Sequence, residues 1–315
     1  MTGSIDREAI AAAQTRIRPF IRATPILGVA PQDFALGRPA SLTLKLEALQ
    51  HTGSFKARGA FANLLSRHAL PKGGVVAASG GNHGAAVAFA AKTLGVSAHI
   101  FVPAISSPAK IARIRGLGAV LTVGGADYAE ALAASEAFAA ETGALPIHAY
   151  DDPLTLLGPG TLGAELEAQA PDLDTLLVSV GGGGLIAGIA AWYQGRARVL
   201  GVETEGCPAL NAAFAAGRPV DAPVGGLAAD SLGARRIGAH CFPIIRAHVA
   251  EALLVTDEAV HEAQRQLWAL ARIVAEPGAA AGLAALLSGR YRPRAGERLG
   301  LIVCGANTAA VNFDA

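Results

Sequence analysis

The sequence is poor in cysteine and carries almost no net charge, and each shortage excludes a class of protein. Its three cysteines are odd in number and show no C-x-x-C spacing, which argues against a disulfide framework and a structural zinc site. The net charge of +1 gives no electrostatic reason to expect a polyanion. We therefore predict no nucleic-acid partner.

Membrane segments are also lacking. Residues 175–195 are uncharged over a length that would span a bilayer, but four consecutive glycines interrupt them. A buried strand, a glycine turn and a buried helix explain this run better. The first residues, M-T-G-S-I-D-R-E, lack the basic and apolar parts of a signal peptide. We predict no membrane contact and a cytoplasmic location.

What the sequence does contain is a large apolar fraction in an alternating order. Its 315 residues are 52% hydrophobic and 16% charged, which is typical of a soluble globular enzyme. Short β-rich runs alternate with helical runs, which indicates parallel sheets. We expect strands at residues 41–46, 75–78, 98–102, 119–123, 175–180, 199–203, 252–256 and 299–304. Helices are expected at residues 6–21, 82–94, 108–117, 127–142, 156–168, 185–192, 208–216, 257–271 and 277–287, and residues 217–246 are expected to be irregular.

Lys56 is one of only five lysines and lies where a strand-like run gives way to a helical run that ends near residue 68. We expect Ser54 to cap that helix, which places Phe55 and Lys56 in its first turn. Unpaired N–H groups and the positive end of the helix dipole disfavour a cation there. A neutral amine or an imine suits the position better. The alternative is an ordinary lysine that extends into solvent, which is the common case.

Two glycine-rich loops join predicted strands to predicted helices. Gly181, Gly182, Gly183 and Gly184 would point backbone N–H groups at an anion and so form a phosphate cradle. A dinucleotide fold is an alternative, but Ile186 and Ala187 stand where G-x-G-x-x-G needs its last glycine. A close packing turn is another alternative. In the second loop, S-G-G-N-H-G, small side chains and a helix start suit a carboxylate, although a lone Asn or His is more often a cap.

Five motifs occur in a specific order: T-G-S-F-K-A-R-G, S-G-G-N-H, the four glycines, E-P-G-A and C-G-A-N. Together they resemble those of fold-type II pyridoxal phosphate (PLP) enzymes, specifically the serine/threonine dehydratase family with threonine dehydratase and serine racemase. The resemblance implies a tryptophan synthase beta-like α/β fold with two open parallel-sheet domains and the cofactor in the cleft between them. The large domain would comprise residues 1–75 and 150–315, and the small domain residues 76–149. Members of this family are usually homodimers.

The resemblance also assigns roles to residues. Lys56 would hold PLP as an imine and act as the catalytic base. The cofactor-binding residues would be Phe55, Asn82, Gly181, Gly182, Gly183, Gly184, Glu276 and Cys304. The substrate-binding residues would be Ser54, Ser79, His83 and Ser231. Glu203 matches one ligand of a divalent-cation site found in some members, but Ala209 stands where a further acid is needed, so a complete metal site is not expected.

Two residues indicate which reaction the cofactor would support. Cys304 would face the pyridine nitrogen, and an uncharged thiol leaves the ring a poorer electron sink than an aspartate does. Gly80 stands where the racemases of this family place a second serine. Both favour elimination over racemisation. Cys304 has the alternative of being only a small buried hydrophobe.

The resemblance therefore predicts an ammonia-lyase that dehydrates and deaminates L-threonine, L-serine or both. The products would be a 2-oxo acid and ammonia, formed through an aminoacrylate. The alternatives are a dehydratase of another 3-hydroxy amino acid, a serine racemase-like isomerase and, more remotely, a non-catalytic amino-acid-binding module.

Overall fold

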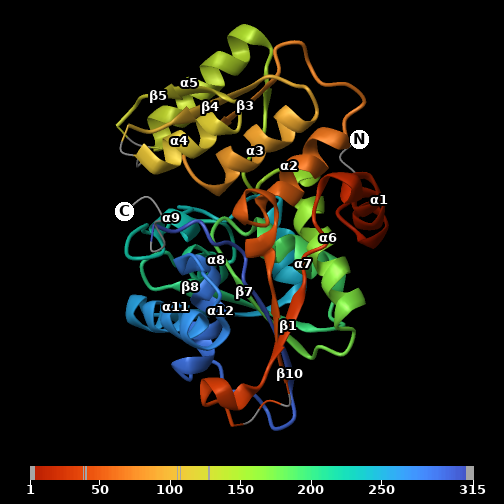
Figure 1. The fold of residues 1–315 in the computed structure, drawn as a ribbon, viewed down its shortest axis with the longest axis vertical. Coiled ribbons are helices and arrows are strands. Elements are labelled where there is room, and N and C mark those ends of the chain that lie inside the picture. The colour runs from red at the N-terminus through yellow and green to blue at the C-terminus, as the bar shows by residue number, and fades with distance from the viewer. Residues whose placement is uncertain are drawn as a thin grey trace.

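The computed structural model of the protein describes residues 4–37, 39, 41–104, 106, 108–126 and 128–309. Within these residues the strands form two sheets, one of six strands and one of four. Figure 1 shows them in separate bodies, the four-stranded sheet above and the six-stranded sheet below. The predicted class, α/β with two open and mainly parallel sheets, is confirmed.

The larger sheet has the strand order β1-β2-β10-β7-β8-β9. Only β1 runs antiparallel to its described neighbour. Its central strand β7 has the sequence T-L-L-V-S and is buried at every position, because helices α7 and α12 pack against it. The bounds are β1 (Ile26–Val29), β2 (Ser41–Lys45), β10 (Arg298–Ile302), β7 (Thr175–Ser179), β8 (Arg198–Thr204) and β9 (Val249–Val255).

The smaller sheet has the order β5-β4-β3-β6, and its described pairings are parallel. Alternate residues of β3 face opposite sides. Val75 and Ala77 pack in the cluster that contains α3, whereas Val76 and Ala78 pack with side chains of α5. The bounds are β5 (Val120–Val123), β4 (Ala98–Val102), β3 (Val75–Ala78) and β6 (Leu145–Pro146).

The helices follow the predicted alternation closely. They are α1 (Arg7–Ile17), α2 (Lys56–Leu65), α3 (Asn82–Thr93), α4 (Pro108–Gly116), α5 (Tyr128–Thr142), α6 (Pro153–Gln169), α7 (Gly184–Tyr193), α8 (Ala209–Ala216), α9 (Ala229–Leu232), α10 (Cys241–His248), α11 (Asp257–Ala271) and α12 (Pro277–Leu287). Asp127, where the helix at residues 127–142 was expected to begin, lies outside the described residues. Among the described helices, none combines the length and apolarity needed to cross a membrane.

One element prediction is wrong. Residues 217–246 were expected to be irregular, but they contain α9 and most of α10. Pro243 lies in the first turn of α10, where the missing N–H costs nothing because that amide has no partner within the helix. Phe242 and Ile245 bury one face of this short helix against the core.

The topology brings three of the predicted site segments to one edge of the larger sheet. Lys56, Gly181 and Cys304 follow the ends of β2, β7 and β10, and β10 pairs with both of the other strands. Since parallel strands carry their carboxyl ends at the same edge, these segments meet at one edge of the larger sheet. Figure 1 shows α2, and α3 of the smaller body, lying between the two sheets.

Candidate active site

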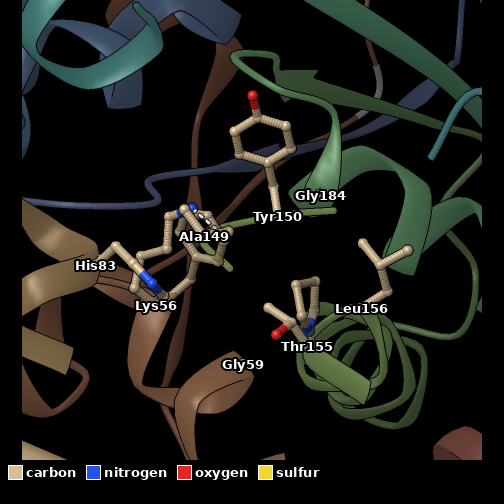
Figure 2. A pocket seen from close by; sticks show the side chains of 10 residues that line it. Lys56, Gly59, His83, Ala149, Tyr150, Thr155, Leu156 and Gly184 are labelled. Carbon is tan, nitrogen blue, oxygen red and sulfur yellow. Dashed lines mark hydrogen bonds between the residues drawn. The ribbon is translucent and has the colours of Figure 1, made fainter. Parts of the chain in front are cut away.

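Lys56 opens helix α2 and points into a small enclosed space beside His83 and Ala149, as Figure 2 shows. Phe55 also lines this space. Lys56 Nζ donates a hydrogen bond of 2.7 Å to the carbonyl oxygen of Ala149. Loss of hydration around the amine lowers the pKa of Lys56 from 10.5 to about 8. A large fraction of the amine is therefore neutral in mildly alkaline solution, in accord with the expectation for this position.

The predicted cap of α2 is wrong. Phe55, not Ser54, is the N-cap residue, and no side-chain cap hydrogen bond is made there. Ser54 has an extended backbone, and within the described part of the chain its buried Oγ has no hydrogen-bond partner. The N–H groups at the start of α2 are consequently available to a ligand. The unpaired Ser54 hydroxyl is itself a polar group that a ligand would satisfy.

Asn82 and Glu276 lie together although 194 residues separate them. The Asn82 amide nitrogen donates to both carboxylate oxygens of Glu276, at 2.8 and 3.0 Å. The amide nitrogen of Asn307 donates to Asn82 Oδ1 at 2.5 Å and to the carbonyl oxygen of Thr52 at 2.9 Å. Burial raises the pKa of Glu276, and the Asn82 hydrogen bond offsets part of that rise. Asn307 thus ties the Lys56 segment to the start of α3.

The remaining members of the S-G-G-N-H loop are fixed by the backbone. His83 Nε2 lies 2.8 Å from the carbonyl oxygen of Ile147 and therefore carries the proton of the neutral ring. Burial and then the Lys56 charge lower the pKa of His83 to about 3. Ser79 Oγ accepts the N–H of Gly81 at 3.2 Å, and Gly81, the N-cap residue of α3, makes no side-chain cap hydrogen bond. The backbone N–H groups at the start of α3 therefore have no side-chain cap from Gly81, and the Glu276 carboxylate lies on the Asn82 amide beside them.

The four-glycine loop leads into α7, and Gly184 lines the same pocket as Lys56. Gly183 has φ +94°, a conformation that other residues rarely adopt, and no side chain from this N-cap position caps α7. A Cβ at Gly182 would lie 2.4 Å from the Tyr150 ring. The structure thus shows that the glycines allow close packing against Tyr150, and the phosphate cradle stays a prediction for this loop.

Two buried thiols flank Lys56. Cys304 follows β10, and its carbonyl oxygen accepts the N–H of Phe55 at 3.0 Å. Cys241, which the sequence analysis did not select, lies 3.3 Å from the carbonyl oxygen of Tyr150. Burial raises the pKa of both thiols, so both are uncharged near neutral pH. Cys304 is thus a neutral group close to the amine.

Glu203 and Ser231 contact helix N-termini. The Glu203 carboxylate accepts the N–H groups of Leu210 and Asn211 and the side-chain amide of Asn211, at 2.6 to 2.9 Å. Both of its oxygens are therefore engaged in holding α8. Ser231 Oγ accepts the N–H of Gly278 at 2.9 Å and so holds α12 beside Glu276. Among the described residues, no group of three His, Cys, Asp or Glu side chains could hold a metal ion.

Gly80 has a neighbour that the sequence analysis did not foresee. A Cβ at this position would lie 2.6 Å from Ser106 Oγ and 2.9 Å from a methyl carbon of Val102. Real Cβ atoms essentially never approach other atoms so closely. The Ser106 side chain therefore occupies the space into which a side chain at position 80 would grow.

PLP carries an aldehyde, an aromatic ring and a phosphate, and a site that binds it needs a group to match each of them. Helices α2 and α7 begin at this pocket. Their N-cap residues, Phe55 and Gly183, carry no side-chain group that caps the first N–H groups. Their N-termini suit a phosphate, and the amine of Lys56 suits an aldehyde. The residues present therefore fit the cofactor. Asn307, Tyr150 and Cys241 were missed, and only Asn307 had a signal, since it ends the C-G-A-N motif.

Comparison with known proteins identifies the family. Residues 17–305 match the model of the family described as pyridoxal-phosphate dependent enzyme. The L-threonine ammonia-lyase of Geobacter sulfurreducens is 38% identical over 300 residues, which cover 94% of this chain and 74% of the relative. The phenylserine dehydratase of Ralstonia pickettii is 36% identical over 314 residues, which cover 98% of this chain and 95% of the relative.

Solved structures give the same result. The chain matches the threonine deaminase of T.th. with a TM-score of 0.90 and 38% identity, covering 98% of this chain and all of the other. Maize serine racemase matches with a TM-score of 0.90 and 32% identity, covering 97% and 94% of the two chains. The predicted resemblance and enzyme class are confirmed. The chain belongs to the family of pyridoxal-phosphate dependent enzymes.

Proposed function

We propose that the protein dehydrates and deaminates L-threonine, L-serine or both, releasing a 2-oxo acid and ammonia. The observation that carries this proposal is the Lys56 amine, which is enclosed, held 2.7 Å from the Ala149 carbonyl oxygen and has its pKa lowered to about 8. The named activities of relatives at 36–38% identity, L-threonine ammonia-lyase and phenylserine dehydratase, support the same reaction class.

Lys56 removes the proton from the substrate Cα. A general base works best when its pKa lies near the working pH, and loss of hydration has brought this amine there. PLP, when bound, supplies the electron sink for the charge that proton removal leaves behind. The proton then held on Lys56 Nζ can pass to the departing β-hydroxyl, so one residue takes the proton and returns it.

The cofactor and substrate contacts that we propose are those that the resemblance implies. We assign the phosphate to the N–H groups of Gly181, Gly182, Gly183 and Gly184 at the start of α7, with Phe55, Asn82, Glu276 and Cys304 around the ring. The start of α3, with Ser79 and His83, receives the substrate carboxylate. Ser54 and Ser231 complete the predicted substrate contacts. The neutral Cys304 thiol leaves the pyridine nitrogen without a carboxylate partner, which favours prompt loss of the hydroxyl.

A racemase is the second candidate, and one observation favours it: maize serine racemase shares this fold with a TM-score of 0.90. Gly80 opposes it, because position 80 offers no hydroxyl for a second base. A chiral assay of the substrate recovered after partial turnover separates the two. Accumulation of the D-amino acid faster than that of the 2-oxo acid would favour the racemase.

We also propose the location, the assembly and the division into domains that the resemblance implies. The chain would act as a cytoplasmic homodimer, with residues 76–149 as a small domain against residues 1–75 and 150–315. The separate four-stranded sheet supports this division. Engagement of both Glu203 oxygens by α8 argues against a divalent cation at that carboxylate.

The test is an absorption spectrum of the protein with PLP, followed by measurement of 2-oxo acid release from L-serine and L-threonine. We expect cofactor absorbance bound to the protein, turnover of at least one substrate, and loss of both in Lys56→Ala. Lys72→Ala, a change at an exposed lysine, is the matched control and should behave as the wild type. Turnover retained by Lys56→Ala without added amine would overturn the assignment.

A further inference from the structure

A second cavity adjoins the Lys56 pocket. It has a volume of about 310 Å³, and His148, Asp151, Arg236, Ile237 and Ala239 lie in its wall. We call this space the outer cavity. Small-ligand sites usually measure about 300–1,000 Å³, so the outer cavity is large enough for a single ring. Tyr150 lines both spaces, and in Figure 2 its ring extends away from Lys56.

Tyr150 is placed to act as a partition between the two spaces. One face of its ring packs on Gly182, where a Cβ would come within 2.4 Å. His148 contacts the ring edge-on, with 4.8 Å between ring centroids. Within the described part of the chain, the phenol hydroxyl donates one hydrogen bond, a long one of 3.4 Å to the carbonyl oxygen of Arg236. The ring is therefore well packed on one side and weakly held at its tip.

The geometry of the proposed reaction directs the substrate side chain towards this partition. The proton on Cα must face Lys56 Nζ, the amine must face the cofactor, and the carboxylate is assigned to the start of α3. These three groups fix three of the four bonds of Cα, so the bond to Cβ points in the fourth direction. Ala149 O holds Lys56 Nζ, and Tyr150, the next residue, lines the wall of the same pocket. A large β-substituent that extends along this wall would meet the Tyr150 side chain.

The charges around the outer cavity are already paired within the protein. Asp151 accepts the N–H groups of Ala239 and His240 at 2.8 and 2.7 Å. Arg236 Nε donates to Asp221 Oδ1 at 2.7 Å. His148 Nδ1 accepts the N–H of Asp151 at 2.8 Å, so the ring is held as a neutral acceptor. A charged substituent would compete with these pairs, whereas an uncharged one would not.

We propose that Tyr150 is a specificity-determining residue, and that the outer cavity behind it receives a bulky, uncharged β-substituent such as an aromatic ring. The preferred substrate class is then a 3-hydroxy amino acid larger than threonine. This inference rests on the proposed function, because it uses the proposed position of the substrate Cα.

The experiment measures kcat/KM for L-serine, 3-phenylserine and 3-hydroxyaspartate with the wild-type holoenzyme and with Ala239→Phe and Tyr150→Ala. Phenylalanine at position 239 shortens the outer cavity and should lower the 3-phenylserine to L-serine ratio by roughly tenfold or more, the scale of steric discrimination in apolar pockets. Removal of the Tyr150 ring should raise that ratio. Ala269→Phe, at an exposed position on α11, is the matched control and should leave it unchanged.

A second measurement does not depend on turnover. L-Phenylalanine and L-alanine lack the leaving hydroxyl, so their dissociation constants report side-chain fit alone. Ala239→Phe should weaken L-phenylalanine binding relative to L-alanine. Ratios that stay within twofold in both variants, or a preference for 3-hydroxyaspartate over 3-phenylserine, would overturn this inference even if L-serine is turned over. If neither these three substrates nor L-threonine reacts, the proposed function itself fails and this inference fails with it.

Discussion

The Ser106 side chain fills the space beside Gly80 that a larger residue at position 80 would need. A side chain at position 80 would meet Ser106 Oγ at 2.6 Å, so Gly80→Ser should destabilise the native protein by about 1–3 kcal/mol, as overpacking does. Gly80→Ser combined with Ser106→Ala removes the closer of the two clashes and should recover part of that loss, since the Val102 methyl carbon remains at 2.9 Å. Thermal unfolding of the two single variants and the double variant measures the coupling. Additive losses would show that the two positions do not share one space.

The same pair bears on the choice of reaction. If the hydroxyl at position 80 is what the chain lacks for racemisation, the double variant should form D-serine from L-serine faster than the wild type does. The chiral assay described above measures this directly. A double variant that folds well, binds PLP and forms no more D-serine would show that the hydroxyl alone is not sufficient.

Lys56 makes stability depend on pH in a defined direction. Its pKa is about 8 in the folded cofactor-free protein and 10.5 in an ordinary environment. Between these values the unfolded chain binds more protons than the folded chain, so the free energy of unfolding rises with pH across this window. A shift of this size corresponds to roughly 3 kcal/mol in total. Chemical denaturation at pH 7.5 and at pH 10.5 should show the gain.

Lys56→Met is the control for this pH dependence, since methionine has an unbranched side chain of similar length and no titrating group. The difference between wild type and variant cancels the contributions of other groups that titrate in this range. Parallel pH profiles of the two proteins would contradict the lowered pKa of Lys56.

At the scale of elements, a buried charge network anchors α2 beneath Lys56. Arg58 donates two hydrogen bonds of 2.8 Å to Glu47 and one of 2.9 Å to Glu165. Lys45 at the end of β2 donates to Glu165 at 2.6 Å. The network contains two cations and two anions, so its formal charges cancel. It joins β2, α2 and α6 at the point where Lys56 enters the site.

Removing one member of this network should cost far more than removing a surface pair. Arg58→Met leaves the fully buried Glu47 without its cation and should lower the free energy of unfolding by about 3–5 kcal/mol. Arg265→Met, which breaks an exposed pair with Glu262, should change it by less than about 1 kcal/mol. Denaturant titration compares the two. A similar effect of both changes would contradict the structural role of the network.

The elements themselves were largely predictable from local pattern. Short apolar runs bounded by glycine and proline gave β3, β4 and β7, and Pro277 and Asp257 marked where α12 and α11 begin. Local pattern was insufficient for α10, because the helix has only eight residues and Pro243 within it reads as a helix breaker. It was also insufficient for β6, whose two residues form a strand only because β3 lies alongside.

At the scale of the whole molecule, the site was only partly predictable. Lys56 and the four glycines could be selected because each has an unusual local context. Asn307 could not be connected to Thr52 or Asn82, since 255 and 225 residues separate them and only the folded sheets bring them together. The same holds for Tyr150 and Cys241, whose importance depends on what packs against them.

Helix α4 links the smaller body to the larger one beside the site. Arg113 donates a hydrogen bond to the carbonyl oxygen of Thr52, which also accepts from Asn307, and Lys110 pairs with Asp230 of α9 at 2.9 Å. Figure 1 shows α4 facing α9 across the gap between the two bodies. The Asp230 side chain is 82% exposed, whereas Arg113 is half-buried and reaches the turn that precedes Lys56. The two contacts should therefore differ in their effect on the reaction.

Arg113→Met removes a hydrogen bond to the turn that precedes Lys56, and a small misplacement of that turn should lower kcat/KM by roughly 10- to 100-fold. Because this contact lies between the two bodies rather than inside either core, the melting temperature should change little. Lys110→Met is the matched control on the same helix, and its effect should be less than about threefold and should disappear at high salt. Equal losses in the two variants, or a loss for Arg113→Met that is matched by a large fall in melting temperature, would show that α4 only stabilises the fold and does not position the Lys56 turn.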